Sequence, residues 1–225
     1  MRKYTTLLFD NDNTLMDFTL SEATAVAVTL KQFSLPSDSE TISLYSKINQ
    51  GFWEAYERGE IEKNEIFAGR FARLLSLIGG KVVAEEMWHA YEENLSKQYF
   101  MIDGAVSVCE ALKKKYSMYI ITNGTASVQE NRLKNSGLQQ LFDGVFISEK
   151  VGYQKPKKEF FNEVIKSITE KDKSKILIIG DSMSSDILGG INSGIDTCWF
   201  NPDNQKPKYN PTYEIKSLSE LCEML

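Results

Sequence analysis

Two carboxylates, one residue apart, directly follow a short apolar run near the start of the chain. Asp10 and Asp12 lie in the segment Phe-Asp-Asn-Asp-Asn-Thr, which ends at Thr14. An ionised carboxylate beside a hydrophobic strand is unfavourable unless a cation or hydrogen bonds compensate its charge. The pair therefore indicates a bound metal, a nucleophile or an acid/base couple. Asp and Asn also favour turns and helix caps, so this segment alone is equally compatible with a plain turn.

Polar residues also follow later apolar runs. They are Thr122, Asn123 and Gly124 after the run 118–122, Lys155 and Pro156 shortly after the run 144–147, and Gly180, Asp181 and Asp186 after the run 176–180. Each group alone has an ordinary explanation as a turn, a solvated lysine or a helix cap. In open α/β sheets, however, ligands bind beyond the carboxyl ends of the strands. Four such ends, each followed by polar groups, together predict a phosphate site.

The segments that position these residues alternate between two periodicities. The apolar runs, with a further one at 196–200, are typical of parallel strands buried on both faces. Residues at helical spacing lie between them in 160–168 and again at Ile187, Leu188 and Ile191, where Gly194 is placed to end the helix. We expect the Gly189-Gly190 pair to permit close packing of this helix on the sheet. The alternation predicts an α/β fold with a doubly wound, mostly parallel, Rossmann-like sheet.

Residues 17–97 break this alternation. They contain four apolar patterns with helical spacing, and the segment is too long to be a loop in a compact domain. We therefore predict a helical domain at 17–97, inserted into a core domain formed by residues 1–16 and 98–225. After the Pro/Asn-rich stretch 201–211, a last short strand and a helix are expected.

Composition excludes several classes of function. The chain has 225 residues, of which 42% are hydrophobic and 25% charged, and its formal net charge is −5. The negative charge argues against nucleic acid polymers and anionic membranes as partners, and no apolar stretch reaches membrane-spanning length. Cys109, Cys198 and Cys222 form neither a disulfide framework nor a zinc motif, so we expect reduced thiols in a cytoplasmic protein. The single histidine, His89, lies in a helical pattern, which argues against histidine-based catalysis.

The four polar motifs, taken as a set, resemble those of the haloacid dehalogenase superfamily of aspartate-nucleophile phosphohydrolases. In chain order the matching segments are Asp10-Asn11-Asp12-Asn13-Thr14, Thr122-Asn123-Gly124, Lys155-Pro156, and Gly180-Asp181 followed by Asp186. Asn13 stands where many members have Asp or Gly, at a variable position. The true dehalogenases of the superfamily differ at the second acid, so Asp12 favours phosphate chemistry over carbon–halogen cleavage.

The resemblance implies catalytic roles for five residues. Asp10 would be the nucleophile that forms an aspartyl-phosphate, and Asp12 would be the general acid and base. Thr122 and the backbone N–H of Asn123 would bind the phosphoryl oxygens of the substrate. Lys155 would neutralise the charge of the nucleophile and of the transferring group.

The resemblance also implies Mg²⁺ as the cofactor. The Asp10 carboxylate, the Asp12 backbone carbonyl and the Asp181 carboxylate would be its ligands, because Mg²⁺ prefers oxygen donors. Asp186 would orient a ligand water or Lys155. Thr14 would either support the first loop or make ordinary turn hydrogen bonds.

Several segments resemble more specifically the bacterial pyrimidine 5′-nucleotidases of this superfamily. They are 121–124 with Gln129, Arg132 and Leu133 following, 148–156, 186–191, 52–61 and 69–71. This resemblance implies that 17–97 is a cap that excludes water and selects the leaving group, and that the substrate is a nucleoside monophosphate. Trp53 and Arg70, with Phe18 and Tyr56, are candidates for contacting its base. Aromatic residues at helical spacing are more often bundle core.

Two other functions stay open on the sequence. The first is a sugar-phosphate or general small-metabolite phosphatase built on the same scaffold. The second is a catalytically silent binding module; the intact set of five polar residues argues against it, namely Asp10, Asp12, Thr122, Lys155 and Asp181. The sequence leaves the base preference open, and is compatible with a monomer or a dimer.

Overall fold

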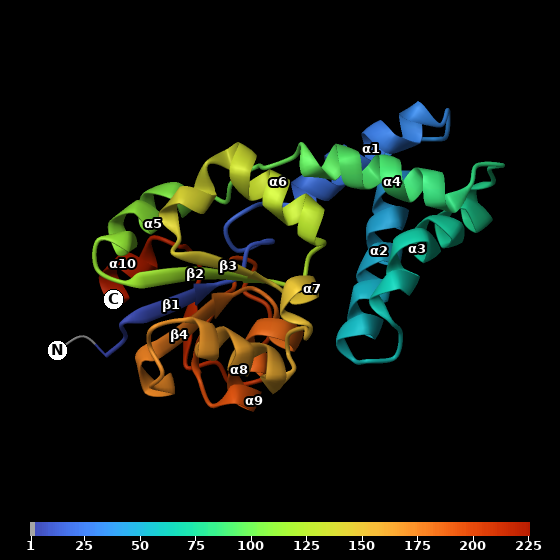
Figure 1. Ribbon diagram of the computed structural model, residues 1–225. Coiled ribbons are helices and arrows are strands. Elements are labelled where there is room, and N and C mark those ends of the chain that lie inside the picture. The colour runs from blue at the N-terminus through green and yellow to red at the C-terminus, as the bar shows by residue number, and fades with distance from the viewer. Residues whose placement is uncertain (1–2) are drawn as a thin grey trace. The chain divides into compact units, whose positions relative to one another are not determined.

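The computed structural model describes residues 3–225, and the chain divides into two compact units (Figure 1). The α/β unit comprises Met1–Asp17 and Met101–Leu225, and the helical unit comprises Phe18–Phe100. The chain therefore leaves the α/β unit once, soon after its first strand, and returns to it.

A parallel sheet of six strands forms the centre of the α/β unit. The strands are β1 (Thr6–Phe9), β2 (Ser117–Thr122), β3 (Gly144–Ile147), β4 (Ile176–Gly180), β5 (Asp196–Phe200) and β6 (Tyr213–Ile215). Their order is β3-β2-β1-β4-β5-β6, and every neighbouring pair is parallel. This is the doubly wound order, in which the connections run in opposite directions from β1 and from β4. The predicted fold class is confirmed.

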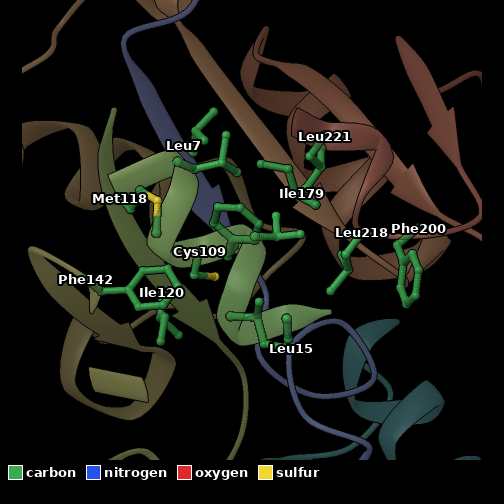
Figure 2. Packing of buried hydrophobic residues seen from close by; sticks show 14 of the residues in the cluster. Leu7, Leu15, Cys109, Met118, Ile120, Phe142, Ile179, Phe200, Leu218 and Leu221 are labelled. Carbon is green, nitrogen blue, oxygen red and sulfur yellow. The ribbon is translucent and has the colours of Figure 1, made fainter. Parts of the chain in front are cut away.

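Alternate residues of each central strand pack into two different hydrophobic layers. Leu7 and Ile179 face a cluster that includes Cys109 of α5 (Ala105–Lys113), and Figure 2 shows their side chains there. Leu8 faces the opposite cluster, which includes Phe161 of α8 (Lys158–Ser167). Because successive side chains of a strand point to opposite faces, a strand covered on both sides must be apolar throughout. This requirement explains the continuous apolar runs of the sequence.

Helices connect the strands of the α/β unit. They are α5 (Ala105–Lys113), α6 (Ala126–Ser136), α7 (Ser148–Val151), α8 (Lys158–Ser167), α9 (Leu188–Ser193) and α10 (Glu220–Met224). Gly194 ends α9 with a φ of 68°, as predicted. The helical face expected from Ile187 and Ile191 is wrong for Ile191, which is 47% exposed. A π-helical turn (Met183–Ile187) precedes α9, and its wider winding shifts the residues that follow.

The helical unit contains four helices. They are α1 (Phe18–Gln32), α2 (Ser39–Glu57), α3 (Lys63–Ile78) and α4 (Ala84–Ser96). α1 packs against α2 and α4, and α3 packs against α2 and α4. Tyr45, Phe71 and Tyr91 bring their rings together in the interior, with centroids 5.1 to 5.5 Å apart. The apolar helical stripes of the sequence are thus this unit's own core.

A search for membrane-spanning segments among residues 3–225 finds no helix with the required length and apolar character.

Close packing of α9 on the sheet depends on a missing side chain. A Cβ atom at Gly190 would lie 2.2 Å from Thr197 Cγ2. Gly190→Ala should therefore lower the free energy of unfolding by about 1 to 3 kcal/mol, because overpacking a tight core forces its neighbours to move. Chemical denaturation monitored by circular dichroism measures the change. Ile191→Ala, at an exposed position of the same helix, should shift the unfolding free energy by less than about 0.5 kcal/mol. Equal losses in the two variants would contradict the packing argument.

Candidate active site

The loop after β1 is folded by its own backbone. Asp10 directly follows β1, and its N–H donates to the carbonyl of Ile179 in β4, 2.8 Å away. The start of the loop therefore continues the pairing of β1 with β4. The N–H groups of Leu15 and Met16 both donate to the carbonyl of Asn11 at 2.9 Å. Asn13 has a φ of 58°, in the left-handed region that Asn tolerates. This tight loop fixes the backbone positions of Asp10 and Asp12, from which their side chains extend.

Lys155 is the cation of the site. Its side chain is 1% exposed, and its Nζ donates to Asp10 Oδ1 at 2.6 Å, to Asp186 Oδ1 at 2.7 Å and to the Ile121 carbonyl at 3.1 Å. Asn123 anchors the backbone of this lysine twice. Its Nδ2 donates to the Lys155 carbonyl, and its Oδ1 accepts from the Lys155 N–H, each at 2.9 Å. The loop after β3 is therefore tied to the end of β2.

Three carboxylates meet at the same place. One oxygen of each of Asp10, Asp181 and Asp186 lies within 4.8 Å of the others. Asp186 is fully buried, and its Oδ2 accepts from the backbone N–H of Ser182 at 3.2 Å. A Cβ at Gly180 would lie 2.3 Å from that same Oδ2, so only glycine leaves room for the carboxylate. The Gly-Asp sequence is thus a steric requirement of the site.

The threonines of the two motifs are both buried. Thr14 Oγ1 lies 3.3 Å from Asp10 Oδ2 and 3.4 Å from Asp181 Oδ1, and accepts from the Asp181 N–H at 3.1 Å. Thr14 therefore ties the loop after β1 to the loop after β4. Thr122 Oγ1 accepts from the backbone N–H of Gly124 at 3.0 Å. This bond places the Thr122 hydroxyl at the carboxyl end of β2.

Burial and mutual repulsion dominate the electrostatics of the cluster. Burial raises the pKa of Asp10 to about 7; the Lys155 ammonium acts against this rise, and the Asp186 and Asp12 carboxylates add to it. Burial also raises the pKa of Asp181 well above its usual range, with further contributions from Asp10 and Asp186. Burial alone would lower the pKa of Lys155, but the Asp10 and Asp186 carboxylates outweigh it and the pKa is raised. The site has more buried negative charge than one ammonium group can balance.

A divalent cation fits this donor set. Asp10, Asp181 and Asp186 offer hard oxygen ligands that converge on one point, and their charge exceeds that of Lys155. Hard oxygen donors of this kind are what Mg²⁺ prefers, whereas no histidine or cysteine belongs to the cluster. The role of the Asp12 backbone carbonyl as a further ligand stays a prediction.

Asp12 lies beside the cluster and has partners of its own. Its Oδ2 accepts from Gln129 Nε2 at 2.6 Å, and its Oδ1 is paired with Arg132 Nη1. Sequence reasoning did not assign Gln129 and Arg132 to the site. A signal was present, since both are polar residues one helical turn apart in α6, directly beside the apolar Val128 and Leu133. All four turn out to be buried.

Trp53 and Arg70, two of the four residues predicted from the helical unit, differ in exposure. Trp53 is half-buried, packs edge-on against Tyr56 with ring centroids 6.0 Å apart, and has Lys63 Nζ 5.6 Å from its ring. Arg70 is only 4% exposed, and its Nη1 donates to Asn49 Oδ1 at 2.7 Å inside the unit. Arg70 is therefore part of the interior of the helical unit. A substrate contact by either residue stays a prediction.

Comparison with known proteins gives a consistent result over the whole chain. The family model described as haloacid dehalogenase-like hydrolase matches residues 7–200. The HAD-hydrolase YfnB of Bacillus subtilis is 40% identical over 227 residues, which cover 100% of this chain and 97% of the relative. A crystal structure of YfnB bound to magnesium superposes with a TM-score of 0.94 at 39% identity, covering 99% of each chain.

Two further relatives are named as nucleotidases. The pyrimidine 5′-nucleotidase PynA of Streptococcus pneumoniae is 36% identical, covering 99% of this chain and 95% of the relative. The pyrimidine 5′-nucleotidase YjjG of Escherichia coli is 33% identical, covering 99% of this chain and 98% of the relative. The similarity to both extends through the helical unit as well as the α/β unit.

The excess of buried carboxylates predicts stabilisation by Mg²⁺. Adding Mg²⁺ to EDTA-treated protein should raise the thermal midpoint, because a ligand that binds only the folded state adds about 2.7 kcal/mol of stability at 100 times its Kd. In Asp181→Asn most of this shift should be lost. Differential scanning calorimetry measures both shifts without any need for activity. Glu159→Gln, which removes an exposed carboxylate of α8, should keep the full shift; an undiminished shift in Asp181→Asn would place the ion elsewhere.

Proposed function

This chain belongs to the haloacid dehalogenase-like hydrolase family, as its motifs predicted, and from that premise we propose that it is a Mg²⁺-dependent phosphatase of pyrimidine nucleoside 5′-monophosphates. The observation that carries the proposal is the buried contact of 2.6 Å between Lys155 Nζ and Asp10 Oδ1. A carboxylate that must attack an anionic phosphate needs a cation beside it to lower the charge repulsion, and the Lys155 ammonium group is that cation.

The first chemical step uses the Asp10 carboxylate as the nucleophile. A carboxylate oxygen of Asp10 forms a bond to phosphorus, and the bond from phosphorus to the nucleoside 5′-oxygen breaks. The electron pair of the broken bond stays on the 5′-oxygen, which takes a proton from Asp12. Lys155 lowers the repulsion between the Asp10 carboxylate and the phosphate as they approach.

The second step returns the enzyme to its starting state. A water molecule gives a proton to Asp12, and its oxygen forms a new bond to phosphorus. The bond between Asp10 and phosphorus then breaks, so that inorganic phosphate leaves and the Asp10 carboxylate is restored. Throughout both steps Thr122 and the backbone N–H of Asn123 would hold the phosphoryl oxygens. Both residues lie at the end of β2, beside the lysine loop that Asn123 anchors.

Mg²⁺, when held by Asp10, Asp181 and the Asp12 backbone carbonyl with Asp186 beside them, supplies positive charge against the phosphate dianion. Without it, three carboxylates and a phosphate would share a single ammonium group.

The substrate assignment rests on relatives and on the helical unit. Full-length similarity to two proteins named as pyrimidine 5′-nucleotidases supports a nucleoside monophosphate over a simple sugar phosphate. The helical unit would act as the cap that selects the leaving group. Trp53 offers a half-buried ring with which a base can stack. Arg70 would contribute by holding the unit's interior unless the bundle rearranges around the substrate.

Phosphate release from a substrate panel tests this proposal. UMP, dUMP and dTMP should be hydrolysed in the presence of Mg²⁺ and not in EDTA. Removing the base, as in ribose 5-phosphate, should lower kcat/KM by at least about tenfold if the base contributes roughly 1.4 kcal/mol or more to binding. Asp10→Asn should lose turnover on every substrate, because the amide is not a competent nucleophile.

The other outcomes separate the alternatives. Equal rates on sugar phosphates and nucleotides would retain the mechanism and overturn the substrate assignment. Full activity of Asp10→Asn would overturn the mechanism. An absence of turnover on all substrates, by folded protein loaded with Mg²⁺, would favour a binding module.

A further inference from the structure

We propose that Gln129 and Arg132 of α6 are positioning residues for Asp12, and that Gly124 lacks a side chain so that Gln129 can reach this carboxylate. The inference rests on the proposed function, because it assigns these residues to the proton-transfer step of Asp12. It assigns functions to three residues, and the four sequence motifs by themselves do not specify these functions.

The Asp12 carboxylate is held at both oxygens by one helix. Gln129 Nε2 donates to Oδ2 at 2.6 Å, while Arg132 Nη1 is paired with Oδ1. Gln129 is 2% exposed and Arg132 is fully buried, whereas the Asp12 side chain is 23% exposed. A buried guanidinium is among the most costly groups to place in a protein interior. Its position against Asp12, a partly exposed acid of the first loop, is what calls for a role.

The direction of the Gln129 amide is fixed by a second neighbour. Asn11 Nδ2 donates to Gln129 Oε1 at 2.6 Å, so the opposite end of the amide must present its N–H to Asp12. Asn11 is fully buried and lies between the two catalytic acids in the sequence. The chain of bonds from Asn11 through Gln129 to Asp12 therefore links the rotamer of the acid to the loop that carries it.

Gly124 makes this arrangement sterically feasible. A Cβ atom there would lie 2.2 Å from Gln129 Nε2 and 2.8 Å from Gln129 Cδ. The φ of Gly124 is outside the left-handed region, so the backbone does not itself require glycine. The glycine of the Thr122-Asn123-Gly124 motif is thus explained by the space that the Gln129 amide needs.

A held carboxylate transfers protons more efficiently than a rotating one. An acid that is partly exposed would otherwise sample several rotamers, and misplacement of a reacting group by about 1 Å can cost 10²-fold in rate. The two donors leave Asp12 one orientation relative to Asp10. In the first step, which kcat/KM reports, the expected benefit is confined to substrates whose leaving group needs a proton, whereas the second step uses Asp12 for every substrate.

Comparing two leaving groups tests the proposal. A nucleoside alkoxide needs a proton on departure, whereas p-nitrophenolate leaves without one. Arg132→Met should lower kcat/KM on UMP by about 10- to 100-fold, a part of the roughly 10²- to 10⁴-fold that general acid catalysis supplies, and kcat/KM on p-nitrophenyl phosphate by less than about threefold. Arg132→Lys should recover part of the loss, and Lys134→Met, at an exposed position of the same helix, should behave as wild type.

A shape-conserving variant guards against unfolding of the arginine variant. Gln129→Glu keeps the acceptor for Asn11 but places a carboxylate against Asp12, so the same selective loss on UMP is expected. Circular dichroism and the thermal midpoint identify which variants are folded. Equal losses of kcat/KM on the two substrates in a folded variant would mean a merely structural role and would overturn the proposal. A higher kcat/KM on UMP would mean that Gln129 and Arg132 keep Asp12 away from the substrate, and this result would also overturn the proposal.

Gly124 is tested by a double-mutant cycle with Gln129. Gly124→Ala should reproduce the selective loss on UMP in the wild-type background. It should cause no further loss of kcat/KM in the Gln129→Ala background, because the side-chain atoms with which its Cβ would clash are absent. An additive loss would instead implicate the bond between the Gly124 N–H and Thr122 Oγ1, and would refute the assignment of the glycine to Gln129.

The proposed function has its own control in the same assay. Asp12→Asn should show the selective loss on UMP at least as strongly as Arg132→Met. If Asp12→Asn lacks it, the acid/base role assigned to Asp12 is wrong. If Asp12→Asn shows it and Arg132→Met does not, only the positioning role fails.

Discussion

The ammonium group of Lys155 donates to the Asp10 and Asp186 carboxylates and to the Ile121 carbonyl while its side chain is 1% exposed. Three buried carboxylates without it would be strongly unfavourable, since removing one partner of a buried ion pair typically costs about 3 to 5 kcal/mol. Two neighbouring residues support the contacts of Lys155. Asn123 fixes the lysine's backbone, and Gly180 leaves space for the Asp186 carboxylate. The excess negative charge that remains is what makes the site suited to a divalent cation.

The topology explains why residues so distant in sequence meet. β1 lies between β2 and β4, and all strands are parallel, so their carboxyl ends share one edge of the sheet. The chain turns in opposite directions from β1 and β4, which opens space at this edge. Asp10 and Asp181 come directly after β1 and β4, and Thr122 is the last residue of β2. Thr14 joins the loop after β1 to the loop after β4 through its contacts with Asp10 and Asp181.

The strands and the meeting of Asp10, Asp181, Asp186 and Lys155 were predictable because their signals are local. A strand buried on both faces must be apolar, and polar residues at its end are conspicuous. Other features depend on atoms that one sequence segment does not specify. The exposure of Ile191 follows from a π-helical turn, which a uniform helical period does not anticipate. The pairing of Arg132 with Asp12 depends on the position of α6 beside the first loop, so the resemblance that included Arg132 gave it no partner.

The contacts of Arg70 were likewise not predictable from the sequence. Its segment resembles that of the nucleotidases, which made Arg70 a candidate for contacting the base; in the structure it is buried and donates to Asn49, which in turn donates to Glu22. Burial raises the pKa of Glu22, while bonds from Ser46 and Asn49 and the charge of Arg70 oppose that rise. Arg70 also lies over the Tyr91 ring, 4.7 Å from its centroid. Releasing Arg70 to a ligand would leave Glu22 as a buried acid without its counter-charge, so the interior of the helical unit is the more stable place for this arginine.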